Sequence, residues 1–176
     1  MHQLRLSRLL TYALLFFLPL AMANCGGKNG DDAISPASIE GNWKLTAMKV
    51  NPGLDAGPFG KITDMLKFFT DLTGSTCLTD ITFTFKKDGT STADTPKSCQ
   101  GNTEDIEDQS GIDITGTSKW ALVGDQLTLT DSDGTKQVVT AKINGNTMSW
   151  TYKDKFEDSK GVASSHDISI EYKRAQ

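Results

Sequence analysis

Apolar and polar side chains alternate along much of the chain after Ile39. A period of two residues predicts β-strands, because successive side chains of a strand point to opposite faces of a sheet. In the first such segment Trp43, Leu45 and Ala47 share one face, and Met48 belongs to the other. Eight segments follow this pattern, at residues 43–48, 80–86, 91–94, 114–122, 127–130, 139–143, 147–153 and 167–173.

Tight turns connect most of these segments. Asp88-Gly89 and Asn144-Gly145 are typical of short hairpins between antiparallel strands. Strands joined in this way form a meander, and closing the meander into a barrel removes its exposed edges. We therefore predict an all-β fold, an eight-stranded antiparallel up-and-down barrel. A flattened sandwich of the same strands is the alternative.

Residues 60–72 depart from the two-residue period. Their apolar side chains recur at the three- and four-residue spacing of an amphipathic helix, between Pro58 and Gly74 as boundaries. The apolar positions are Ile62, Met65, Leu66, Phe69 and Leu72. The pattern predicts one helix inserted between the first and second strands, at the mouth of the barrel.

The N-terminus has the order of an export signal. Arg5 and Arg8 precede an apolar run at residues 9–18, and small residues follow it. The run is too short to span a membrane permanently. We therefore interpret residues 1–24 as a signal peptide.

Cys25 directly follows this predicted signal peptide. The residues resemble a bacterial lipoprotein signal, in which this cysteine becomes the lipid-bearing first residue, although Met22 and Asn24 depart from the usual pattern. The resemblance implies a membrane anchor made of acyl chains such as palmitate. Cleavage after Ala23, which would release a soluble protein, is the alternative.

Three cysteines in an exported chain leave one unpaired. If Cys25 is acylated, Cys77 and Cys99 remain as an even pair, and an oxidising compartment favours a disulfide between them. Two buried thiols are the alternative. Neither cysteine belongs to a close-spaced zinc pattern.

The charge of the chain limits its partners. Without Arg5 and Arg8 the chain keeps 16 of its 18 basic residues against 22 acidic ones. An acidic surface disfavours nucleic acid and anionic lipid, so we expect membrane contact only through the acyl chains on Cys25. Residues 25–37, rich in Gly, Asp and Ser, predict a flexible tether, and residues 38–176 form the barrel domain.

Aromatic side chains on the predicted inward faces are the best candidates for a ligand site. With Phe69 from the helix, the candidate ligand-binding residues are Phe69, Phe83, Phe85, Trp120, Trp150 and Tyr152. Core packing accounts for the same residues without a ligand, since a barrel of eight strands has room for one small molecule at most. Phe68, beside the apolar stripe of the helix, would line a ligand portal or contact a protein partner.

Residues suited to catalysis or metal binding are few. His166 is the only histidine after the signal peptide, and its neighbour Ser165 would point to the opposite face of a strand. We therefore predict that His166 is the polar start of the last strand, with no catalytic residue and no cofactor. The carboxylates at 104–108 and Asp113 lack the ordered spacing of a calcium loop. They predict solvated turns and no metal site.

Gly41-Asn42-Trp43, at the head of the first strand, has the G-x-W form found in lipocalins. Three phrases extend the match, IEGNWKL at 39–45, FTFKKDGT at 83–90 and WALVGDQLTL at 120–129. In this order and spacing they resemble the lipocalin-like domains of Bacteroidetes lipoproteins, over residues 38–174. The resemblance implies a barrel open at one end and closed at the other by Trp43. It also implies a late basic residue packed on Trp43, and Arg174 matches by position, unless it is a frayed terminal residue.

These patterns together predict a lipid-anchored, non-enzymatic lipoprotein of the bacterial cell envelope. We expect it at the outer membrane, on the periplasmic or the surface face, with a barrel that binds a small apolar ligand. A binding barrel predicts a cavity of roughly a few hundred cubic ångströms, lined by apolar side chains under the helix. The alternative is a filled barrel that serves as a protein-interaction or structural component of an envelope complex.

Overall fold

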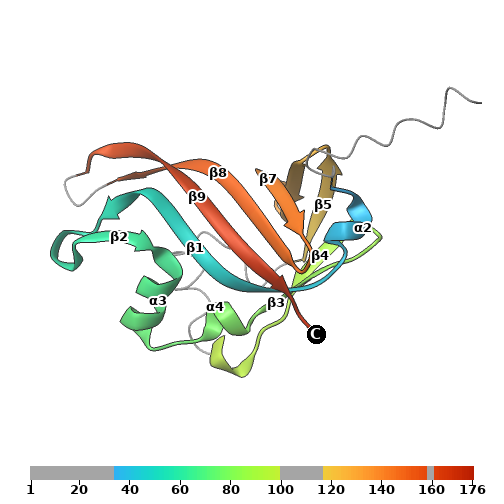
Figure 1. Ribbon diagram of the computed structural model, residues 1–176, viewed down its shortest axis with the longest axis horizontal. Coiled ribbons are helices and arrows are strands. Elements are labelled where there is room, and N and C mark those ends of the chain that lie inside the picture. The colour runs from blue at the N-terminus through green and yellow to red at the C-terminus, as the bar shows by residue number, and fades with distance from the viewer. Residues whose placement is uncertain (1–33, 100–116, 158–160) are drawn as a thin grey trace, which may run out of the picture. The chain divides into compact units, whose positions relative to one another are not determined.

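The computed structural model describes residues 34–99, 117–157 and 161–176, all within one compact unit that spans residues 33–176 (Figure 1). Its helices are α2 (Pro36–Ile39), α3 (Met65–Thr73) and α4 (Cys77–Asp80), with 3₁₀ turns η2 (Gly57–Phe59) and η3 (Lys97–Cys99). Its strands are β1 (Gly41–Asp55), β2 (Lys61–Asp64), β3 (Thr82–Phe85), β4 (Thr90–Ala93), β5 (Thr117–Val123), β6 (Gln126–Thr130), β7 (Lys136–Asn144), β8 (Thr147–Glu157) and β9 (Ala163–Arg174).

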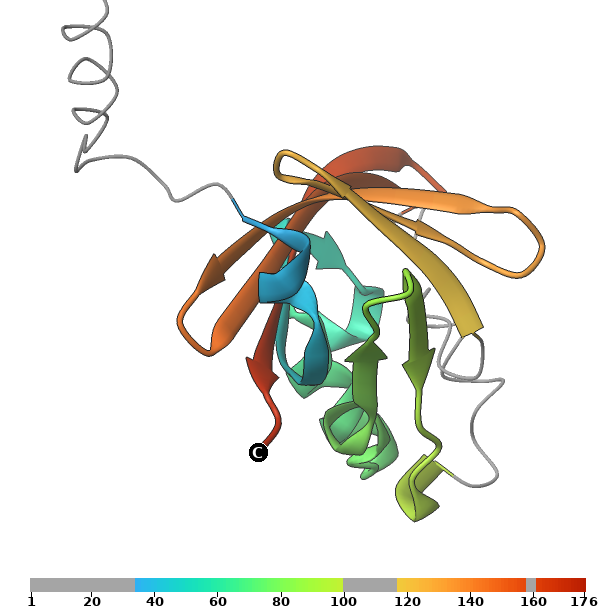
Figure 2. The same cartoon turned by 90° about the vertical axis from the view of Figure 1, so that its right-hand side faces the viewer.

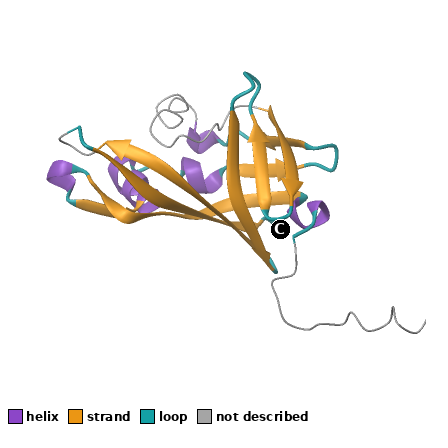
Figure 3. Ribbon diagram, turned by 90° about the horizontal axis from the view of Figure 1, so that it is seen from above, coloured by secondary structure: helices purple, strands orange, loops and turns teal. Residues whose placement is uncertain are grey.

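The strands of this unit form a closed antiparallel barrel. They pair in the order β2-β1-β3-β4-β5-β6-β7-β8-β9, and β9 pairs in turn with β1. Because the last strand returns to the first, β1 and β3 to β9 enclose an interior, which Figure 2 views from the α2 end. Strands make up the body of the unit, and the helices are short segments around it (Figure 3). The predicted eight-stranded barrel is confirmed, and the sandwich is excluded.

The segment predicted as one helix is a strand followed by a helix. Lys61–Asp64 is β2, which pairs with the far half of β1, so Ile62 lies on a strand instead of the helical stripe. The α3 helix begins at Met65, where the Asp64 carboxylate accepts the Lys67 N–H at 2.9 Å. It ends at Gly74, whose φ of 65° is readily adopted only by glycine. Helix α4 was not predicted. No helix in the described parts of the chain has the length and apolar character to cross a membrane.

A β-bulge at Thr46 changes which side chains of β1 face the interior. Opposite β9, Leu45 pairs with Tyr172 and Ala47 pairs with the next residue, Glu171, so Thr46 is left over. One extra residue reverses the alternation beyond it. Met48 is therefore buried and Ala47 only partly so, and the predicted faces are wrong after Leu45.

The buried core follows the other predicted inward faces. Trp43, which closes one end, is 0 % exposed. Side chains from six further strands fill the interior together with it, namely Phe85, Trp120, Leu127, Val139, Ala141, Met148, Trp150, Ile168, Ile170 and Tyr172. Burying this apolar surface is the main stabilising contribution to such a barrel.

Several predictions concern residues outside the described ranges. These are the signal peptide, Cys25 and the acidic residues at 104–108 and Asp113, together with the first part of the strand predicted at 114–122. Within the described chain, α2 begins at Pro36, inside the predicted tether. Ile34 already packs against the core.

Candidate ligand-binding site

A partly open cavity of about 80 Å³ lies inside the barrel. Aromatic rings from β3, β8 and β9 form one side of it. The Trp150 and Tyr172 ring centroids are 4.5 Å apart, and Phe83 meets Tyr172 edge-on at 5.6 Å. Phe85 meets Trp150 edge-on at 6.0 Å. Because these rings hold one another in place, the aromatic wall is preformed.

Polar side chains form the other side of the cavity. Ser118 lies near the start of β5, Asp131 directly after β6, and Gln137 near the start of β7. In an up-and-down barrel these positions share the end opposite α2. The Ser118 hydroxyl donates to Asp131 Oδ1 at 2.8 Å. The cavity is therefore lined both by aromatic rings and by two polar groups, the carboxylate of Asp131 and the side-chain amide of Gln137.

Trp150 has a buried hydrogen-bond donor without an acceptor. Its indole is 5 % exposed, and its Nε1 has no partner within the described chain. The other two indoles are bonded: Trp43 Nε1 donates to Ile39 O at 2.7 Å, and Trp120 Nε1 donates at 3.1 Å to the carbonyl of Lys86 and to that of Thr90. An unpaired buried donor destabilises by about 1–3 kcal/mol. Trp150 thus differs from the other two indoles as a buried donor without an acceptor among the described residues.

Burial raises the pKa values of the two tyrosines beside the cavity, Tyr152 and Tyr172. Burial raises the pKa of Tyr172 far above its usual value, and the neighbouring Tyr152 adds to the shift. Burial also raises the pKa of Tyr152, with a further contribution from Asp154 and a partial offset from Gln137. Both phenols therefore remain protonated, and the cavity has no phenolate at neutral pH.

We expect the barrel to lose stability above about pH 10. Tyrosines of the unfolded chain ionise there while Tyr172 stays neutral in the folded barrel, so the free energy of unfolding should fall by about 1.4 kcal/mol per pH unit for each such tyrosine. Denaturant titrations at a series of alkaline pH values measure the slope. Tyr172→Phe should reduce it. An unchanged slope, or tyrosinate absorbance that appears before unfolding, contradicts the assignment.

Four of the six candidate ligand-binding residues line this cavity, namely Phe83, Phe85, Trp150 and Tyr152. Trp120 does not line it: its ring supports Phe85 from behind at 5.9 Å. Phe69 does not line it either, because it lies on α3 and packs against the core there.

Asp131 and Gln137 on the polar side of the cavity were not among the predicted site residues. The alternation of inward and outward side chains nevertheless extends to the polar residues that line the cavity, because each of them is two positions from an inward apolar side chain. The pairs are Ser118 with Trp120, Asp131 with Leu129, and Gln137 with Val139. Asp131 directly follows β6, and extending the alternation of β6 by one step beyond Leu129 places it at the interior.

The cavity that the described residues line inside the barrel differs from the large apolar cavity expected under the helix. The cavity there is about 80 Å³, polar groups share its lining, and none of its lining residues lies on α3. The physical reason is the size of the rings, since a barrel of eight strands has little room beyond its own side chains.

Trp43 and Arg174 close the end of the barrel beside α2. The Arg174 guanidinium lies 4.2 Å from the centre of the Trp43 ring, the contact that the resemblance implies. It donates to Glu40 O at 2.7 Å and to Ser38 O at 2.8 Å. A Cβ on Gly41 would lie 2.5 Å from Arg174 Nη1, and the φ of 122° at Gly41 is one that other residues rarely adopt. The close approach of Arg174 and the positive φ together explain why position 41, two residues before Trp43, is a glycine.

His166 is buried, which corrects its predicted place at a polar strand start. It is 5 % exposed, its Nδ1 lies 2.6 Å from Pro52 O, and its Nε2 lies 2.7 Å from Ser164 Oγ. Ser164, two residues away, shares its face, whereas Ser165 does not. Neither His166 nor Ser164 lines the cavity. The bond between His166 and Pro52 links β9 to β1 just beyond Asn51, the last residue of β1 that pairs with β9.

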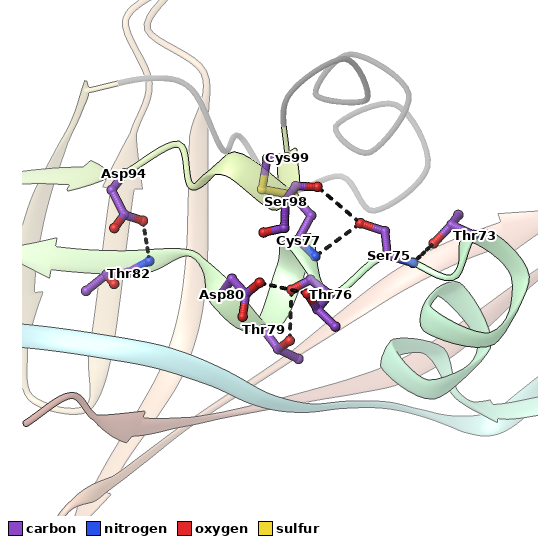
Figure 4. The surroundings of a disulfide bond; sticks show 10 residues. All are labelled: Thr73, Ser75, Thr76, Cys77, Thr79, Asp80, Thr82, Asp94, Ser98 and Cys99. Atoms are coloured by element: carbon purple, nitrogen blue, oxygen red, sulfur yellow. Dashed lines mark hydrogen bonds between the residues drawn. A yellow bond between two sulfur atoms is a disulfide. The ribbon is translucent and has the colours of Figure 1, made fainter.

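A disulfide joins α4 to η3, as the cysteine count predicted (Figure 4). The Cα atoms of Cys77 and Cys99 are 4.7 Å apart, and both residues are buried. The Ser75 hydroxyl accepts the Cys77 N–H at 3.2 Å and donates to Ser98 O at 3.4 Å. In the described ranges no three His, Cys, Asp or Glu side chains come together to hold a metal ion.

The fold and the cavity define a small closed antiparallel barrel with a partly open interior. Residues 39–150 match the family described as the lipocalin-like domain. Because this match covers more than half of the chain, the protein belongs to the lipocalin-like domain family. A search of curated proteins finds no match.

Proposed function

We propose that the protein is a non-enzymatic binding protein that takes a small molecule into the barrel cavity. The observation that carries the proposal is the partly open cavity inside the closed barrel, with a preformed wall of Phe83, Trp150 and Tyr172. A preformed pocket with apolar walls and a few polar groups is typical of small-molecule sites. Membership of the lipocalin-like family supports the same function.

Binding of small one-ring molecules to the purified protein tests this function. We expect saturable changes in the NMR signals of Phe83 and Tyr172 on addition of millimolar toluene or benzamide. Ala93 lines the cavity at the end of β4, so Ala93→Phe should fill the cavity and abolish the changes without unfolding the protein. The proposal fails if neither compound produces a saturable change in the native protein.

We further propose that acyl chains on Cys25 hold the barrel at the cell envelope, at the outer membrane. The support is the resemblance of residues 1–25 to a lipoprotein signal, and the acidic balance of the rest of the chain, which offers no strong attraction to anionic lipid. The run of residues 26–33 would then separate the barrel from the bilayer.

Cys25→Ser should therefore move the protein from the membrane fraction to the soluble fraction and abolish labelling by radioactive palmitate. The reason is that dual acylation supplies nearly all of the expected membrane affinity. Fractionation of cells that express each form measures the change, with a Cys77→Ala, Cys99→Ala variant as a control that keeps Cys25. A Cys25→Ser protein that stays in the membrane fraction contradicts the anchor, and an unlabelled native protein favours cleavage after Ala23.

An exposed aromatic cluster favours a second candidate function, interaction with an envelope protein. Phe59 is 64 % exposed and meets Phe68 of α3 edge-on at 5.7 Å, and Leu72, one helical turn further, is 52 % exposed. Exposed apolar patches often mark contact surfaces. Phe68→Asp should then lose a partner in pull-down experiments that Val123→Asp, an exposed control elsewhere on the barrel, retains. Equal recovery by both variants contradicts this candidate.

A further inference from the structure

The pairing of β7 with β8 ends partway along both strands. It runs from their turn, at Asn144 and Thr147, as far as Thr140 and Thr151. Beyond these residues, within the described chain, β7 pairs with β6 alone, and β8 pairs with β9 alone as far as Glu157 (Figure 1). Backbone hydrogen bonds hold paired strands about 4.8 Å apart. Where this pairing ends, side chains have to close the barrel wall.

A cleft of about 360 Å³ lies at this unpaired section, and we call it the β7–β8 cleft. Side chains from both strands line it. Val138 and Lys153 belong to the outer face of the sheet, whereas Gln137 and Tyr152 alternate with them and belong to the inner face. Because both faces of both strands contribute, the cleft lies between β7 and β8.

Gln137 and Tyr152 line two spaces at once. Each lines the β7–β8 cleft, and each also lines the cavity inside the barrel, which no other described residue does. The two side chains are neighbours, since Gln137 partly offsets the raised pKa of the Tyr152 phenol. They therefore form the partition between the cavity and the cleft. Side chains change rotamer without breaking the hydrogen bonds of the sheet, so this partition can open while the barrel stays folded.

The two spaces differ in size and in character. An engineered apolar cavity of about 150 Å³ in another protein holds one benzene. The cavity here, of about 80 Å³, is smaller, so one ring against Phe83 fills it, and a longer ligand has to extend beyond it. The β7–β8 cleft, on the other side of Gln137 and Tyr152, offers the additional volume.

The cleft suits a polar group without net charge. Lys136, Lys153 and Asp154 line it. Lys153 already forms an ion pair with Asp167 at 2.7 Å, which leaves one cation and one carboxylate to balance each other. Together with Thr140, which also lines the cleft, these side chains offer both donors and acceptors of hydrogen bonds.

We infer that the β7–β8 cleft is the outer half of the ligand site, so that a ligand has its ring in the cavity and passes between Gln137 and Tyr152 to place an uncharged polar end in the cleft. The inference rests on the proposed binding function and specifies the ligand class: an elongated molecule, apolar at one end and polar at the other. It replaces the purely apolar ligand expected from the sequence.

Two uncharged probes of different length test the inference, benzamide and its longer relative N-benzoylglycinamide. The longer probe should bind about 5- to 10-fold more tightly, the effect of about one additional hydrogen bond. In NMR spectra it should shift the methyl signals of Val138 and Thr140, which line the cleft but not the cavity. Benzamide should leave these signals in place.

Two exposed valines provide matched variants. Val138 is 51 % exposed on the outer face of β7, so Val138→Trp should fill the cleft without changing the cavity. We expect it to remove the advantage of N-benzoylglycinamide and to leave benzamide affinity within about twofold. Val123→Trp, at a position on β5 that is 77 % exposed and lines neither space, is the control and should change neither affinity. The melting temperature of each variant checks that it is folded.

The outcomes distinguish this inference from the proposed function. If both probes bind the native protein equally well, the inference is overturned and the binding function stands. The same holds if Val138→Trp keeps the advantage of the longer probe, or if that probe leaves the Val138 and Thr140 signals unmoved, since its polar end then leaves the cavity by another route. If neither probe binds, the proposed function itself is overturned.

Discussion

Arg174→Ala should lower the free energy of unfolding by about 2–4 kcal/mol. The substitution removes two charge-assisted hydrogen bonds, to the carbonyls of Glu40 and Ser38, together with the guanidinium that covers Trp43. The closed end of the barrel depends on these contacts, since they tie the end of β9 to α2 and to Glu40, which joins α2 to β1. Denaturant unfolding followed by tryptophan fluorescence measures the loss.

Arg174→Lys is the matched control. Lysine keeps the charge but cannot donate to two carbonyls in a planar fork or stack over the indole in the same way. We expect it to recover less than half of the loss. Full recovery by lysine would show that charge alone matters, and a loss below about 0.5 kcal/mol in Arg174→Ala would contradict a structural clamp.

Removal of the disulfide should cost about 3 kcal/mol of stability. Cys77 and Cys99 are 22 residues apart in sequence, so the bond restricts a long loop in the unfolded chain. It also fixes α4 against η3, the segments next to β3 and β4. The double variant Cys77→Ala, Cys99→Ala, compared with the native protein by denaturant unfolding, measures the effect.

Cys25→Ser is the control for this second prediction, because it removes the remaining cysteine and leaves the disulfide intact. It should unfold at the same denaturant concentration as the native protein when both are compared without lipid. Free-thiol titration of the unfolded, unreduced protein should find Cys77 and Cys99 unreactive. Two reactive thiols, or a double variant as stable as the native protein, would contradict the assigned bond.

The alternation of side chains predicted the barrel because the inner and outer faces of most strands differ sharply in polarity. In β9, Ile168, Ile170 and Tyr172 are buried and their neighbours are polar. The bulge at Thr46 has no such signal, because it arises from the pairing of β1 with β9 and not from the local sequence. Ile62 fits a helical stripe equally well, and only its pairing with β1 decides that it is in a strand.

The candidate site was only partly predictable from the sequence. The aromatic residues were found because they occupy inward positions, but the free volume depends on how the rings pack in three dimensions. The unbonded state of the Trp150 N–H is likewise a property of the fold: Trp120, at an equally inward position, reaches two carbonyls. Asp131 could not be singled out from the sequence because a polar residue in a turn is usually solvated, whereas here it accepts a hydrogen bond from Ser118 at the cavity.

A crystal structure of the purified protein grown with millimolar benzamide tests the central claim most directly. The account predicts the benzamide inside the barrel, in the cavity lined by Phe83, Ala93 and Tyr152. A cavity without benzamide under these conditions, or a benzamide bound only on the outer surface of the barrel, would contradict it.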